Sequence, residues 1–119
     1  MRFRFAALLV CVVFAFAGLL WPAPIAAHAN LDRSEPVARS AVAVSPSEIR
    51  LFFTEPPELR YSEILVYDAG LQRHEQGQLR AIPGDPLGLA IDAANLADGG
   101  IYTVAWKVVS TVDGHTTNG

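Results

Sequence analysis

Apolar and polar residues alternate in several short runs after residue 30. In residues 48–54, Ile49, Leu51 and Phe53 fall on one face, and this period of two is typical of a half-buried β-strand. The runs are rich in β-branched, aliphatic and aromatic residues, which strands favour. Strands are therefore predicted at residues 48–54, 62–67, 87–91 and 101–110.

Proline and glycine interrupt these runs at short intervals, as at residues 56–57 and 99–100. No interval is long enough for an amphipathic helix, so the predicted fold is all-β, a small Ig-like Greek-key β-sandwich or barrel. Tyr102 lies shortly after the glycine pair at residues 99–100 and resembles a tyrosine corner, whose hydroxyl bonds backwards to the preceding loop. Trp106, on the same strand face, is interpreted as a core residue.

The N-terminal 27 residues have a different pattern. Arg2 and Arg4 precede an apolar run at residues 5–21, and a proline-containing stretch then ends in small residues at Ala27. This is the layout of a secretory signal peptide, so residues 1–27 are predicted to be removed by cleavage after Ala27. An uncleaved membrane anchor is the alternative, because the apolar run is at the lower end of the ~17 to 25 residues that span a bilayer. The domain is exported in either case.

The mature domain, residues 28–119, keeps seven of the nine basic residues and all twelve acidic ones, a net charge of −5 with neutral histidines. This balance disfavours a nucleic-acid partner. The domain contains no further apolar run that could form a membrane span. Cys11 and Met1 are the only sulfur-containing residues, and both leave with the signal. Disulfides and sulfur ligands are therefore excluded from the mature domain.

Two of the three histidines lie in settings that suit a metal. His28 becomes the first residue after the predicted cleavage, so its α-amine and its imidazole can chelate one ion; a frayed terminus is the alternative. Asp113 and His115 project to the same side of an extended segment and can converge, although an Asp-Gly turn explains the same residues. His74 lies in a polar loop without a second ligand nearby and is expected to be exposed to solvent.

An amine, two imidazoles and a carboxylate form a nitrogen-rich donor set without sulfur. Such a set suits the tetragonal preference of Cu(II), with Ni(II) and Zn(II) as competitors. Divalent copper also has the highest affinity for such sites among these metals. The sequence therefore predicts a Cu(II) site rather than a Cu(I) site.

Several short stretches, taken in order, resemble the periplasmic copper-resistance proteins called CopC-like. The resemblance covers nearly all of residues 28–119, and the order and spacing of the stretches carry it. They are His28-Ala29-Asn30-Leu31, Ser34-Glu35-Pro36, residues 49–53 followed by Thr54-Glu55-Pro56, residues 100–104, and residues 106–110 leading into Asp113-Gly114-His115 and Gly119.

This resemblance implies a small Greek-key β-barrel that binds Cu(II) through His28, Asp113 and His115. A glutamate at the position of Glu55 lies close to the metal in some members, and Glu55 is ranked below the other three residues. The family also continues into a final apolar strand after the position of Gly119. Some members have a methionine-rich Cu(I) site, which a mature domain without methionine cannot form.

The leading functional hypothesis is a non-catalytic Cu(II)-binding protein of the bacterial periplasm or outer cell surface. It would sequester copper or deliver it to a CopD-like membrane copper transporter. An enzyme is the second class, because a terminal histidine with another imidazole resembles the copper brace of lytic polysaccharide monooxygenases. A metal-free, Ig-like secreted interaction module is the third. Copper titration separates the first class from the third, and peroxide-dependent turnover of polysaccharide separates the enzyme.

Overall fold

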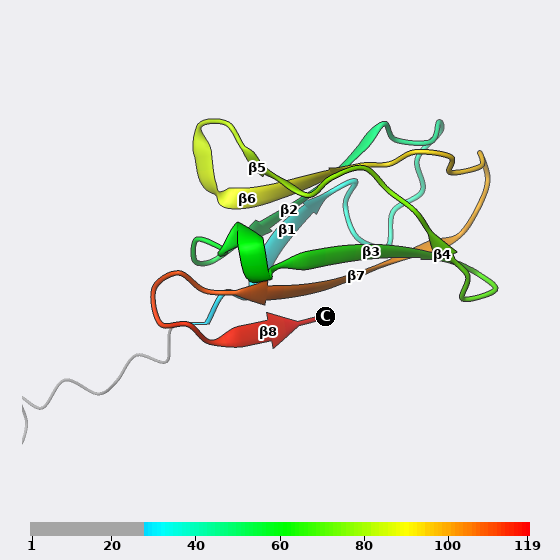
Figure 1. Cartoon of the computed structure of the whole chain (residues 1–119). Coiled ribbons are helices and arrows are strands. Elements are labelled where there is room, and N and C mark those ends of the chain that lie inside the picture. Colours follow the sequence, from blue (N-terminus) through cyan, green and yellow to red (C-terminus); the bar gives the residue numbers. More distant parts are fainter. Residues whose placement is uncertain (1–27) are drawn as a thin grey trace, which may run out of the picture.

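The computed structural model describes residues 28–119, and the predicted signal peptide lies outside this range. Eight strands form two antiparallel four-stranded sheets, ordered β1-β2-β6-β5 and β4-β3-β7-β8 (Figure 1). The predicted all-β sandwich is confirmed. The elements are β1 (Leu31–Glu35), β2 (Glu48–Phe53), the 3-10 helix η1 (Leu59–Tyr61), β3 (Glu63–Asp68), β4 (Arg73–His74), β5 (Arg80–Ile82), β6 (Asp85–Asp92), β7 (Tyr102–Val109) and β8 (Thr116–Asn118).

The four predicted strands are the four central ones. The prediction at 48–54 contains β2, the one at 62–67 overlaps β3 with an offset of one residue, 87–91 lie within β6 and 101–110 contain β7. The strands that alternation did not predict, β1, β4, β5 and β8, are the outer strands of the two sheets. Each is short, and an edge strand buries too little of its surface to need a regular apolar face. Among residues 28–119, no helix is long and apolar enough to cross a membrane.

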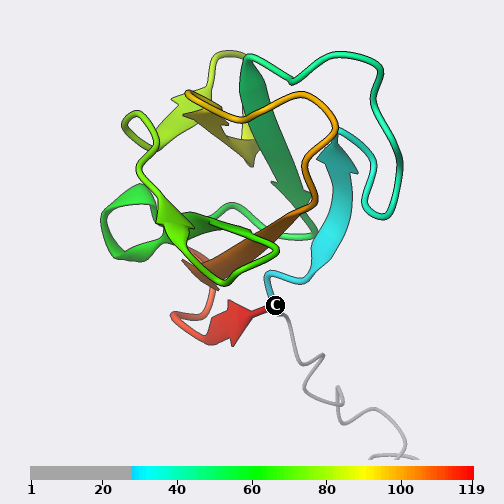
Figure 2. The ribbon, with the colours of Figure 1, turned by 90° about the vertical axis from the view of Figure 1, so that its right-hand side faces the viewer.

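The chain supplies the sheets as hairpins that alternate between them. β1 pairs with β2, β3 with β4, β5 with β6 and β7 with β8, and the sheets are completed by the central pairs β2·β6 and β3·β7. Seen from the end, the strands surround a common interior (Figure 2). This arrangement brings the β7–β8 hairpin to the same end of the sandwich as the start of the described chain.

The core lies between the two sheets. The residues predicted for one face of β2 are buried, and Phe53, which is 1% exposed, packs its ring edge-to-face on Trp106 at 5.3 Å between centroids. Trp106 is half-buried against the core cluster, as its interpretation as a core residue requires. The buried apolar cluster consists of Ala29, Ile49, Leu51, Phe53, Ile64, Val66, Leu89, Ile91, Ala93 and Val108.

The tyrosine corner is confirmed. The Tyr102 hydroxyl at the start of β7 accepts a hydrogen bond from the backbone N–H of Ala97 at 2.7 Å, which fixes the loop that leads from β6 into the second sheet. Gly100 leaves room for the ring, because a Cβ there would lie 2.5 Å from Tyr102 Cε2. The corner therefore sets where β7 begins, and with it the path of the strand toward the candidate site.

An apolar groove of about 630 Å³ runs between the sheets beside β1 and β7. Leu31 of β1 and Val104 and Trp106 of β7 are among the residues that line it. Gly119 lies at the edge of this region, and its backbone N–H and C=O both pair with Trp106, at 3.0 and 2.9 Å. The final apolar strand expected after Gly119 stays a prediction.

Candidate metal centre

The backbone at His28 is held in place by the end of β2. The His28 carbonyl accepts hydrogen bonds from the Thr54 hydroxyl and from the Asn30 N–H, both at 2.7 Å. The Thr54 hydroxyl in turn accepts from the Asn30 N–H at 3.0 Å, and the Asn30 carbonyl accepts from the Thr54 N–H at 2.9 Å. His28 is thus fixed by long-range contacts, in contrast to a frayed end.

Ala29, the next residue, strengthens this attachment. Its side chain is fully buried in the core, and its carbonyl accepts a hydrogen bond from the Thr117 hydroxyl of β8 at 2.7 Å. The start of the described chain is therefore hydrogen-bonded to Thr54, directly after β2, and to Thr117 of β8. Since β8 begins directly after His115, the two halves of the candidate site are attached to the same strand.

Asp113 and His115 lie in the turn between β7 and β8. Gly114 has a φ of +73°, a left-handed conformation that glycine adopts without strain. The Asp113 carboxylate accepts from the His115 backbone N–H at 2.9 Å through Oδ1, and Oδ2 lies 2.7 Å from His115 Nδ1. The Asp113 carboxylate therefore both caps the turn and contacts the His115 imidazole.

The Asp113 contact defines how the His115 ring can bind a metal. An ionised carboxylate only accepts hydrogen bonds, so in the neutral imidazole of His115 the proton lies on Nδ1 and Nε2 has a free lone pair. Metal-ligating histidines commonly have this arrangement, in which a carboxylate orients the ring and raises its basicity. The His115 side chain is 64% exposed, so an ion held there would be accessible from solvent.

The same contacts keep Asp113 ionised. The backbone N–H of His115 lowers the pKa of the Asp113 carboxyl below its ordinary value, and the His115 side chain adds to this effect. Partial burial of the carboxylate opposes this effect. Asp113 therefore supplies a negative charge at neutral pH, which favours a cation between the histidines.

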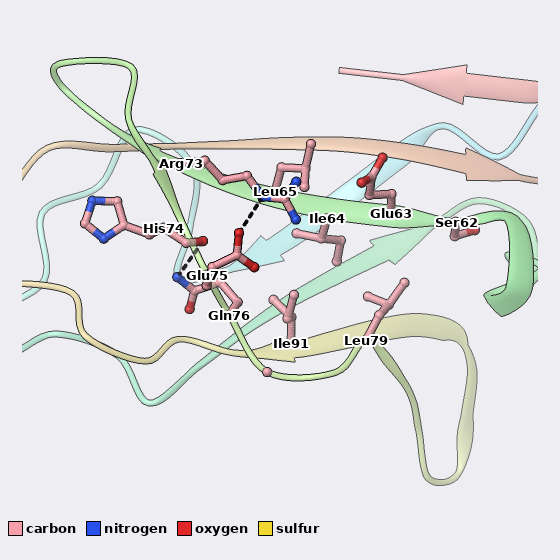
Figure 3. Close-up of a pocket in the computed structure, with 11 residues that line it drawn as sticks. Ser62, Glu63, Ile64, Leu65, Arg73, His74, Glu75, Gln76, Leu79 and Ile91 are labelled. Carbon is pink, nitrogen blue, oxygen red and sulfur yellow. Dashed lines mark hydrogen bonds and ion pairs between the residues drawn. The ribbon is translucent and has the colours of Figure 1, made fainter.

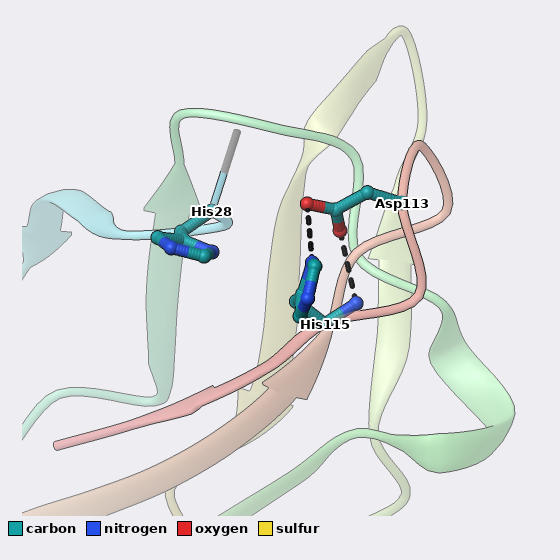
Figure 4. Close-up of side chains that lie close together, drawn as sticks. All are labelled: His28, Asp113 and His115. Carbon is teal, nitrogen blue, oxygen red and sulfur yellow. Dashed lines mark hydrogen bonds and ion pairs between the residues drawn. The ribbon is translucent and has the colours of Figure 1, made fainter. Parts of the chain in front are cut away.

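His28, Asp113 and His115 converge at this end of the sandwich (Figure 4). Each offers one ligand atom, and these atoms all lie within 4.8 Å of one another. The two imidazoles meet edge-to-face, with centroids 5.3 Å apart. Within residues 28–119, His28 Nδ1 is buried and has no hydrogen-bond partner. A buried polar atom without a partner is costly, and a bond from Nδ1 to a metal would satisfy it.

His28 Nδ1, the buried nitrogen without a partner, is also the ring nitrogen that can chelate an ion together with the α-amine. In an N-terminal histidine, the α-amine and Nδ1 close a compact chelate ring around one ion, because both are joined through Cα and Cβ. The amine exists only if the chain is cut directly before His28, and that prediction concerns residues outside the described range. Two imidazoles, a carboxylate and this amine would make a set that suits a divalent transition metal.

Glu55, the fourth sequence-predicted site residue, is held apart from the cluster of three. It follows Thr54 directly, and its Oε2 accepts a hydrogen bond from the Ser110 hydroxyl at 2.5 Å. Direct ligation by Glu55 stays a prediction. Thr54, Ser110 and Thr117 were not predicted from the sequence, and no local motif marks them, because their partners are distant in the chain.

His74 corrects an expectation, because it is half-buried rather than freely exposed. It lies on β4 opposite Val66, its Nε2 is 3.1 Å from Asp68 Oδ2, and its ring packs edge-to-face on Tyr102 at 5.4 Å. The side chain is 26% exposed. The loop after β3 turns back as a short strand and places His74 over the tyrosine corner, where it has a structural role.

A pocket of about 180 Å³ lies beside β4 (Figure 3). His74 points away from the other labelled side chains there, while Arg73 and Glu75 form an ion pair at 3.4 Å. In the part of the chain that the structure describes, the only group of three or more potential ligands that could hold a metal is His28, Asp113 and His115.

An antiparallel sandwich with a histidine and carboxylate cluster at one end defines a small β-domain with a candidate metal site. The CopC domain model matches residues 31–119. The chain therefore belongs to the CopC domain family, and the resemblance seen in its sequence is confirmed.

Two solved structures illustrate the relationship. The crystal structure of CopC from Methylosinus trichosporium OB3b is 33% identical, with a TM-score of 0.70 over 77% of this chain and 87% of that one. PcoC, a methionine-rich copper resistance protein from Escherichia coli, is 28% identical, with a TM-score of 0.68 over 78% of this chain and 93% of that one. A search of curated proteins gave no match.

Proposed function

We propose that this protein binds Cu(II) in the bacterial periplasm and serves copper resistance or homeostasis. His28, Asp113 and His115 are the proposed ligands, and Glu55 is a further carboxylate near the ion. The observation that carries the proposal is the buried Nδ1 of His28, which has no partner within residues 28–119 and lies in a cluster whose ligand atoms are within 4.8 Å of one another.

The donor types favour Cu(II) over Cu(I). PcoC is a methionine-rich protein, whereas this chain has a single methionine, Met1, in the predicted signal peptide. Without thioether or thiolate donors, the mature domain offers nitrogen and carboxylate oxygen, which suit the divalent ion. The anionic Asp113 offsets part of the charge that a divalent ion brings.

The proposal couples copper binding to export. Signal cleavage after Ala27 would create the α-amine that completes the chelate with His28 Nδ1. The chain before export would lack this donor and would bind copper less tightly. The proposed protein is non-catalytic, and the exposure of His115 supports direct transfer of copper to a partner such as a CopD-like membrane transporter.

A comparison of free and acetylated N-termini tests this proposal. N-terminal sequencing of the exported protein should begin at His28, and competition with a Cu(II) chelator should detect tight binding. Acetylating the amine removes one donor while every side chain stays in place, so we expect the affinity to fall. Equal affinity of both forms would refute the role of cleavage, and absence of Cu(II) binding by the free form would refute the function.

A further inference from the structure

Ser110 occupies an unusual position at the end of β7. It is 1% exposed, and among residues 28–119 it is the only polar residue in the buried class. A buried hydroxyl is tolerated when its hydrogen bonds are made. Ser110 Oγ donates to Glu55 Oε2 at 2.5 Å and accepts from the Val112 N–H at 3.0 Å. Both contacts restrain the turn that carries the proposed ligands.

The backbone of Ser110 closes the same turn. Its N–H donates to the His115 carbonyl at 2.9 Å, and its carbonyl accepts from the Gly114 N–H at 3.0 Å. Side chain and backbone together therefore bond to Val112, Gly114 and His115. Asp113, which lies within this segment, is held by its own bonds to His115.

The Glu55 contact connects this turn to the other half of the site. Glu55 receives the Ser110 hydroxyl, and its chain neighbour Thr54 donates to the His28 carbonyl at 2.7 Å. Two consecutive residues after β2 thus hold both halves, one through the backbone of His28 and the other through Ser110. A shift of the 111–115 turn would move His115 relative to His28, whose ring centroids are 5.3 Å apart.

We infer that Ser110 is a positioning residue of the metal centre, through which Glu55 sets the placement of Asp113 and His115 relative to His28. This inference rests on the proposed function. Neither residue needs to bind the metal in this role. Contacts that orient metal ligands are worth about 10- to 100-fold in metal affinity in other proteins.

The test measures Cu(II) affinity by chelator competition and the Cu(II) coordination geometry by electron paramagnetic resonance. Ser110→Ala leaves every proposed ligand in place, yet we expect about a 10- to 100-fold weaker affinity and an altered spectrum. Glu55→Ala should cause the same change, and the double variant should be no worse than either single one, because both remove one interaction. Glu55→Gln keeps an oxygen that accepts from Ser110, and should therefore recover most of the affinity that Glu55→Ala loses.

Matched controls lie close by in the chain. Ser62 donates its hydroxyl to the Glu58 carbonyl at 2.8 Å, outside the metal centre, so Ser62→Ala removes a comparable hydroxyl. Glu58→Ala makes the same charge change as Glu55→Ala. We expect both controls to bind Cu(II) like the wild type, and circular dichroism of the metal-free variants checks that each is folded. If Ser110→Ala does not fold, the two Glu55 variants decide the question.

Two results would overturn the inference. Wild-type affinity and spectrum in Ser110→Ala would remove the positioning role. Equal losses in Glu55→Gln and Glu55→Ala, with normal binding in Ser110→Ala, would make Glu55 a direct ligand instead. Failure of the wild-type protein itself to bind Cu(II) would refute the proposed function, and that outcome is distinct from both.

Discussion

The hydroxyl of Thr54 offers a direct test of how the fold holds His28. Thr54→Val is nearly isosteric and removes the bond that the hydroxyl donates to the His28 carbonyl at 2.7 Å. It also removes the acceptor for the Asn30 N–H, but that N–H keeps its second partner, the His28 carbonyl, at 2.7 Å. The net loss is therefore about one hydrogen bond, without a new orphaned donor.

The exposure of Thr54 sets the free-energy loss expected for Thr54→Val. One net hydrogen bond contributes about 0.5–1.5 kcal/mol, and a solvent-exposed one lies in the lower part of that range, at about 0.5–1 kcal/mol. If this cost falls on the placement of His28, Cu(II) affinity decreases about two- to fivefold, since a tenfold change corresponds to about 1.4 kcal/mol. The melting temperature of the metal-free domain should fall by about 2–8 °C.

Chelator competition and thermal unfolding measure the two effects separately. Thr116→Val, on the exposed part of β8, is the matched control and should leave Cu(II) affinity unchanged. Unchanged affinity in Thr54→Val, with a clear loss in His28→Ala, would show that the backbone contact does not position the ligand. The account of the site as a product of long-range backbone contacts would then be wrong.

Three further predictions concern single side chains. His115→Ala should weaken Cu(II) binding at least about 10- to 100-fold in chelator competition, whereas His74→Ala should leave it unchanged. Tyr102→Phe removes the corner hydrogen bond and should lower the free energy of unfolding by about 1 kcal/mol in urea titrations, with Cu(II) affinity retained. The Gln72 N–H lowers the pKa of Asp68 below its ordinary value, and the His74 side chain adds to this. Asp68 therefore stabilises the fold above its unfolded-state pKa and loses this effect as the pH falls through its lower folded-state pKa, so the deficit of Asp68→Asn in thermal unfolding should be present at pH 7 and disappear in strong acid.

The strands that could be predicted from the sequence are those that pair with a neighbouring strand on both sides. β2, β3, β6 and β7 are central strands, and the apolar face that each needs is visible as alternation in the sequence. The outer strands have compositions such as Leu-Asp-Arg-Ser-Glu in β1 and Thr-Thr-Asn in β8. Their conformation depends on the partner strand rather than on their own pattern, so sequence alternation alone does not reveal them.

The burial of His74 also could not be predicted from its neighbours in the sequence. Its neighbours in the sequence are polar, and they predict exposure. In the structure, Asp68 binds the Gly70 and Gln72 N–H groups through Oδ1, so the loop turns back and His74 pairs opposite Val66. The burial of the ring comes from Tyr102 on another strand, and this contact has no signature near His74 in the sequence.

For the candidate site, the sequence predicted the donors but not what supports them. The chemistry of histidine and aspartate, together with the predicted cleavage point, singles out His28, Asp113 and His115. The supporting contacts join residues far apart in the chain, such as Thr54 with His28, 26 residues away, and Ser110 with Glu55, 55 residues away. The sequence alone does not distinguish a serine or threonine that supports the site across such a sequence separation from any other serine or threonine.

Among residues 28–119, the hydrogen bond with the largest sequence separation explains how the predicted N-terminus of the mature domain can belong to a rigid site. Thr117 donates to the Ala29 carbonyl across 88 residues of sequence, and the Ala29 side chain is fully buried. The residue after His28 is therefore a core residue, and the second residue after His115 binds it. The two imidazoles can meet only when the core has formed and β8 has paired with β7. Signal cleavage would supply the amine, and folding after export would bring the other donors to it, so the proposed copper site would be complete only in the folded, processed protein.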